Sequence, residues 1–75
     1  MDQQVRVIAK VIQERKNQDR KWGGTEHVDQ HTDLDWLSFI DKYASRVVWC
    51  RDARDNFIKI AALAVAAVKS IDRRT

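Results

Sequence analysis

At 75 residues the chain has the length of one domain, and a single core of that size is only marginally stabilising. It has no proline, and with Cys50 as its one cysteine it can form neither an internal disulfide nor a cysteine clamp for a metal. Fourteen Lys/Arg against eleven Asp/Glu give a net charge of +3, which suits an anionic ligand but falls short of the dense basic stripe of a duplex-binding protein.

Targeting and membrane signals are missing from this sequence. The segment MDQQVRVIAK lacks the apolar run of a signal peptide, and no segment approaches the roughly 20 apolar residues that span a bilayer. We therefore expect a soluble, cytoplasmic protein with no membrane partner.

The first element is predicted to be a helix over residues 3–21. Its stripe of residues at three- and four-residue steps lies on one helical face and consists of Val5, Ile8, Val11, Ile12 and Arg15. Gly23 or Gly24 supplies the left-handed residue that ends such a helix, and Arg20 and Lys21 lie at the negative end of its dipole.

A connection over residues 22–32 follows, WGGTEHVDQHT, which holds both glycines and both histidines of the chain. A turn needs only small and polar residues, so this concentration of indole, imidazole and carboxylate predicts a functional loop. The next helix is predicted over residues 33–49, because Thr32 and Asp35 have capping-box spacing. Its apolar stripe consists of Trp36, Leu37, Ile40, Tyr43, Ala44, Val47 and Val48.

The last helix is predicted over residues 52–73, with Asp52 able to cap it. Its segment FIKIAALAVAAVKSI is apolar nearly all round, and two other helices cannot cover such a helix on most sides. Its small residues would let a neighbouring backbone approach closely: Ala61, Ala62, Ala64, Ala66 and Ala67. The fold prediction is thus one all-α domain, residues 1–75, with a helical hairpin and an Ala-rich third helix that packs with its copies in a homo-oligomer. The alternative is an Ala-rich core helix in a compact monomer.

Two polar pairs end the first helix, Glu14 with Gln18 and Arg15 with Asp19, each four residues apart. Both could be solvated, but Arg15 falls on the apolar stripe, where a guanidinium needs a carboxylate or phosphate partner. Trp22 either covers the core or offers a surface for base stacking. With Trp36 it could hold a flat ring between two indoles.

His27, Asp29 and His31 lie within five residues and suggest a metal at first sight. Without a cysteine or a further histidine, hydrogen bonds that stiffen the loop are favoured over zinc ligation. These side chains could also bind ribose hydroxyls or base edges. No nucleophile with a neighbouring base and no glycine-rich phosphate loop is evident.

The pattern ER-x2-QD-x-KWGG-x2-H-x-D-x-H, with the later AALAVAAVKSIDRR, resembles small phage and prophage MazG-like proteins of the all-α nucleoside triphosphate pyrophosphohydrolase group. That family holds Mg²⁺ with an EExxE cluster on one helix and an ExxD pair on the next. Here the helix over residues 33–49 has no glutamate, and Asn56 and Lys59 stand where ExxD would fall. The resemblance therefore implies nucleotide binding without hydrolysis, with Lys59, Lys42 and Arg46 as candidate phosphate partners.

The favoured function is a non-catalytic binder that sequesters a phosphate-bearing nucleotide, such as a cyclic or ADP-ribose-derived signal of bacterial antiviral defence in the host cytoplasm. No catalytic residue, metal or cofactor is expected, and nucleic acid is not expected as a partner. The nucleotide site would be formed by Glu14, Arg15, Gln18, Lys21, Trp22, His27, Asp29, His31, Trp36 and Lys59.

Two alternatives stay open. One is a Mg²⁺-dependent pyrophosphohydrolase, with metal ligands drawn from Asp41, Asp52, Asp55, Glu26 and Asp29. The other is a phage protein that inhibits a host enzyme by direct contact, or a weak nucleic-acid binder.

Overall fold

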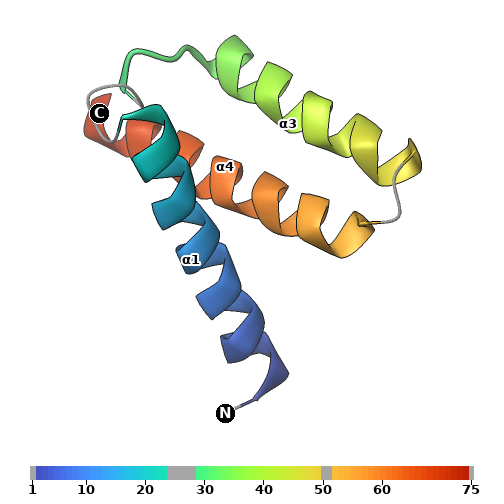
Figure 1. Cartoon of the computed structure of the whole chain (residues 1–75). Helices are drawn as coiled ribbons and strands as arrows, with labels where there is room; N and C mark the ends of the chain where they lie inside the picture. Colours follow the sequence, from blue (N-terminus) through green and yellow to red (C-terminus); the bar gives the residue numbers. More distant parts are fainter. Residues whose placement is uncertain (1, 24–28, 50–51, 75) are drawn as a thin grey trace.

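The computed structural model describes residues 2–23, 29–49 and 52–74, and these contain three long helices and no strand (Figure 1). They are α1 (Gln3–Trp22), α3 (Asp33–Trp49) and α4 (Ala53–Arg74). The all-α prediction is confirmed, and each helix begins and ends within one residue of its expected bounds. Trp22 belongs to α1, however, and not to the connection. His27, Glu26 and Cys50 lie outside the described residues.

Short-range hydrogen bonds explain where α1 begins and ends. The Asp2 carboxylate accepts a hydrogen bond from the backbone N–H of Val5 at 2.9 Å, which satisfies one of the free donors of the first turn. At the other end Gly23 has a φ of 99°, and its N–H donates to the carbonyl of Asp19. A left-handed residue at this position favours glycine, so the predicted stop at Gly23 is confirmed.

The predicted capping box forms at the start of α3. The Thr32 backbone N–H donates to Asp35 Oδ2 at 2.9 Å, and the Asp35 N–H donates to Thr32 Oγ1 at 3.2 Å. The backbone hydrogen bond from Thr32 is the main reason why the pKa of the Asp35 carboxyl lies below its ordinary value of 3.8.

This capping box predicts a loss of stability in acid. Because the folded state lowers the pKa of Asp35, the stabilisation is complete well above pH 3.8 and is lost as the pH falls through the lower folded-state pKa. We expect Asp35→Asn to show a smaller fall in unfolding free energy between pH 5 and pH 3 than the parent chain, measured by urea titration followed by circular dichroism. Asp41→Asn, which removes an exposed carboxylate from the same helix, is the control. An unchanged acid dependence in Asp35→Asn would contradict the prediction.

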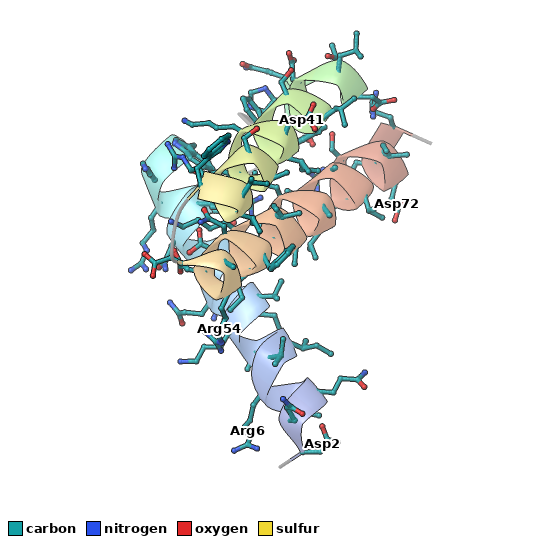
Figure 2. The ribbon with its side chains drawn as sticks, turned by 90° about the vertical axis from the view of Figure 1, so that its right-hand side faces the viewer. Asp2, Arg6, Asp41, Arg54 and Asp72 are labelled. Atoms are coloured by element: carbon teal, nitrogen blue, oxygen red, sulfur yellow. The ribbon has the colours of Figure 1, made fainter. Side chains whose placement is uncertain are left out.

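The three helices form a hairpin with one helix laid across it. α3 and α4 run antiparallel and side by side, α4 packs against both other helices, and the N-terminal half of α1 projects away from the hairpin (Figure 1). Arg6 lies on this projecting half (Figure 2). None of the helices that the structure describes combines the length and apolar character needed to cross a membrane.

The core is small and lies mainly between α3 and α4. Trp36, Tyr43, Leu63 and Ala66 are buried in contact with one another. Partly buried side chains surround them: Trp22, Phe39, Ile40, Ile60 and Ala67. Trp22 thus brings the end of α1 onto the hairpin core.

Part of each predicted apolar stripe is left uncovered. On α1, Val5, Ile8 and Ile12 are exposed, because only the C-terminal half of this helix contacts α4. On α3, the stripe divides: Trp36 and Tyr43 are buried, whereas Leu37 and Val48 are exposed. An apolar stripe on one helical face is therefore only partly buried within this single chain.

Candidate functional site

Two polar side chains of α1 are buried where this helix crosses α4. Gln18 is only 2% exposed, and its Nε2 donates to Glu14 Oε2 at 3.1 Å and to the carbonyl of Lys59 at 3.4 Å. Arg15 is also buried; its Nη2 donates to Asp19 Oδ1 at 2.9 Å, and its Nη1 makes a long 3.5 Å contact with the carbonyl of Ala62. Both predicted pairs are confirmed, and the partner of the Arg15 guanidinium is a carboxylate of its own helix.

The Gln18 side chain carries an unused acceptor. Its amide nitrogen already faces two acceptors, which fixes the orientation of the amide group. Its Oε1 is buried, and no donor among the described residues bonds to it. Since buried polar atoms in folded proteins nearly always have a partner, Oε1 is an unsatisfied acceptor enclosed by protein at the junction of α1 and α4.

Three cationic side chains surround the ring of Tyr43. The Arg46 guanidinium carbon lies 5.2 Å from the ring centroid, and the ammonium nitrogens of Lys59 and Lys42 lie at 5.7 Å and 5.9 Å. Each distance is within the range of a cation–π contact. We call Tyr43, Lys42, Arg46 and Lys59 the Tyr43 cluster. Its three cations are the side chains predicted from the sequence as phosphate partners. Two of them come from α3 and one comes from α4.

The cations of the Tyr43 cluster differ in their surroundings. Lys59 Nζ lies 3.1 Å from Asp55 Oδ2, and this hydrogen bond, with a smaller contribution from the charge of Glu14, raises the pKa of Lys59 above its ordinary value. None of the described carboxylates lies within ion-pair distance of Lys42 or Arg46, although both are exposed. The positive charge available to a ligand is therefore concentrated on these two side chains.

Lys59 connects the Tyr43 cluster to α1. Its carbonyl accepts the hydrogen bond from Gln18 of α1, while its ammonium lies near the Tyr43 ring of α3. Residues of all three helices therefore meet around one position of α4. Glu14 joins the group through its hydrogen bond from Gln18.

The two indoles do not form the sandwich that the sequence suggested. Trp36 is 4% exposed, and the rings of His31 and Phe39 lie edge-on to it with centroids at 5.0 Å and 6.0 Å. It is a core residue, and at this burial its indole offers almost no surface on which a ligand ring could stack. Trp22 is half-buried and packs against the core, as one of the two predictions had it, with Lys21 Nζ 5.4 Å from its ring centroid.

Asp29 and His31 belong to another part of the molecule. Asp29 accepts two hydrogen bonds from Arg73 Nε, at 2.8 Å and 3.0 Å, which joins the connection before α3 to the end of α4. Arg73 follows Lys59 by 14 residues, or about 21 Å along a helix. The predicted site therefore divides into a group around Lys59 and a group around Trp36 and Arg73. No local pattern indicates the Asp29–Arg73 pair, because the two residues lie 44 positions apart in the chain.

Within the described ranges, no group of three or more His, Cys, Asp or Glu side chains is arranged to hold a metal ion. Asp41 of α3, Asp52 just before α4 and Asp55 of α4, which the sequence suggested as possible metal ligands, are all exposed. Comparisons of the chain with protein-family models, with curated proteins and with solved structures found no match.

Proposed function

We propose that this protein binds a phosphate-bearing nucleotide without converting it, and so sequesters it. The observation that supports this most directly is the Tyr43 cluster, in which three cations gather around one ring and two of them have no carboxylate partner among the described residues. Clustered like charges repel one another, and a bound polyanion would relieve that repulsion.

Different groups would bind different parts of the ligand. The Arg46 guanidinium can donate two parallel hydrogen bonds to a phosphate, with Lys42 as a second, point-like charge. The accessible part of the half-buried Trp22 indole could stack on a base. A cyclic or ADP-ribose-derived signal of antiviral defence is the ligand class that we propose, following the resemblance of residues 14–31 to phage MazG-like proteins.

The position of Lys59 supports the proposal of binding without turnover. Its ammonium lies beside Asp55 and is influenced by the charge of Glu14, so it offsets the negative charge that a divalent ion would need. The proposal is therefore that the ligand is held by side-chain cations and is released intact.

The test is isothermal titration of a nucleotide panel, in the presence of a chelator, against the parent chain and Lys42→Ala/Arg46→Ala. We expect the double variant to bind the tightest-binding nucleotide of the panel roughly 10- to 100-fold more weakly. This loss is near the low end of the range for two charge-assisted hydrogen bonds, because both side chains are exposed to solvent.

Lys10→Ala/Lys16→Ala is the matched control, because it removes the same charge from exposed positions of α1. A flat response across the panel, or an equal loss in the control, would contradict the proposal. Release of pyrophosphate on addition of Mg²⁺ would replace it with the hydrolase alternative.

A further inference from the structure

The side of the α3–α4 hairpin that faces away from α1 is apolar and uncovered. On α4, Lys59 and Ala62 meet α1 through their carbonyls, whereas Phe57, Ala64 and Val68 lie on the opposite side of the helix at spacings of seven and four residues. Phe57 and Val68 are 58% and 56% exposed.

An equivalent stripe runs along α3. Leu37, Ala44 and Val48 are exposed and recur at spacings of seven and four residues, about a third of a turn from the buried Trp36 and Tyr43. Because α3 and α4 are antiparallel, right-handed helices bring this stripe to the same side as the one on α4. We call these six residues of the two stripes the open face. The Tyr43 cluster lies on the other side, next to α1.

The open face is large enough to need a partner. From Phe57 to Val68 it extends about 17 Å along α4, and two helices side by side are about 20 Å wide, so its projected area is roughly 300 Å². Its accessible area is larger, since side chains stand out from the surface. The largest contiguous apolar patch of a soluble monomer is typically a few hundred Å² and is often functional, so the open face is a candidate interaction surface.

The shape of the open face suits a second copy of itself. Large side chains occupy both ends, with Leu37 and Val68 towards one end and Val48 and Phe57 towards the other, while Ala44 and Ala64 leave a shallow centre. Two such faces can lie against each other with the α4 helices antiparallel, so that the backbones approach closely at the alanines and Phe57 of one chain packs beside Val68 of the partner subunit. A two-fold axis through the centre repeats every contact, as closed dimers require.

The charges at the rim fit the same arrangement. Arg54 and Asp72 lie near opposite ends of α4 (Figure 2). They are 18 residues apart, which is five helical turns, so both lie on one side of the helix, next to the open face. When two α4 helices lie antiparallel, Arg54 of one chain comes near Asp72 of the partner subunit, and the symmetry axis forms this pair twice.

We propose that this protein forms a two-fold symmetric dimer through its open face, with the α4 helices of the two copies antiparallel. The occupant of the face is a second copy of the chain, because the alanines at the centre allow close approach and the opposite charges near the two ends of α4 pair with those of an antiparallel copy. The Tyr43 cluster stays on the outer side of the dimer and accessible to its ligand.

Sedimentation velocity of the parent chain and of Val68→Asp tests the proposal. We expect a dimer for the parent chain and a monomer for Val68→Asp, since the change places a carboxylate in the apolar contact. Val7→Asp is the matched control, because it makes the same change at an exposed position of α1 and should remain dimeric. A parent chain that stays monomeric at the highest soluble concentration would overturn the proposal, as would a dimeric Val68→Asp.

A charge exchange tests the antiparallel arrangement separately and does not disturb the core. Arg54→Asp should weaken the dimer roughly tenfold, since it brings two carboxylates together at each end, and Arg54→Asp/Asp72→Arg should restore it. Failure of the double variant to recover would overturn this orientation. Nucleotide titration of Val68→Asp reports on the Tyr43 cluster independently, so loss of the dimer and loss of the proposed binding function remain distinguishable.

Discussion

Replacing Leu63 by alanine is expected to lower the free energy of unfolding by about 2 to 5 kcal/mol. Leu63 is 1% exposed and is the largest fully buried apolar side chain of the described core. Its truncation removes buried methyl groups and leaves a cavity between α3 and α4. A chain of 75 residues has a total free energy of unfolding of roughly 4 to 11 kcal/mol. The variant is therefore expected to lose a large part of its stability and to unfold less cooperatively.

Urea titration followed by far-ultraviolet circular dichroism measures this effect. Val65→Ala is the matched control on the same helix, because Val65 is 43% exposed and lies off the open face. We expect this change to stay within about 0.5 kcal/mol of the parent chain. Equal losses in the two variants would mean that the packing of α4 against α3 differs from that described.

Replacing Arg15 by alanine is expected to cost about 2 to 3 kcal/mol and to loosen α1 from the hairpin. The guanidinium is buried, bonds to Asp19 and approaches the carbonyl of Ala62 on α4. Removing one member of a buried pair leaves the other without its partner, and the loss is moderated here because the Asp19 side chain is partly exposed. The apolar stem of Arg15 also packs at the helix crossing, so part of the loss is packing and not charge.

Two further variants separate these contributions. Arg15→Met keeps most of the stem and should lose less stability than Arg15→Ala. Arg6→Ala removes the same charge from the projecting half of α1 (Figure 2) and should have little effect. Hydrogen exchange should show faster exchange of the α1 amides in Arg15→Ala, with α3 and α4 less affected. Uniform acceleration along all three helices would show instead that α1 does not unfold separately.

The helices themselves were predictable because their signals are local. A chain without proline, with Gly23 after the last turn of α1 and a Thr32–Asp35 capping box before α3, leaves few places where a helix can begin or end. The pairs Glu14–Gln18 and Arg15–Asp19 were predictable for the same reason, since residues four apart on a helix are always neighbours.

The candidate site was only partly predictable. Lys59, Lys42 and Arg46 were proposed as phosphate partners, but Tyr43 was assigned to the apolar stripe of α3, and its role as the centre of the three cations was missed. Lys42 directly precedes Tyr43 in the sequence, and Arg46 follows it by three residues, so both are its neighbours on one helix. Two of the three cation–ring contacts could therefore have been predicted from sequence spacing. The third contact depends on how α3 packs on α4.

Sequence alone predicted helices over residues 3–21, 33–49 and 52–73, each within one residue of the observed bounds, because hydrogen bonds between residues four apart and the caps at the ends form within each segment. Tertiary structure decided which side of each helix is buried. Each helix has more apolar surface than its neighbours cover. Where α1 crosses α4, Arg15 and Gln18 are buried, whereas Val5 and Ile8 lie beyond the crossing and are exposed. The same packing brings Lys59 to Tyr43 and leaves the open face uncovered, and neither result follows from residue spacing in one helix.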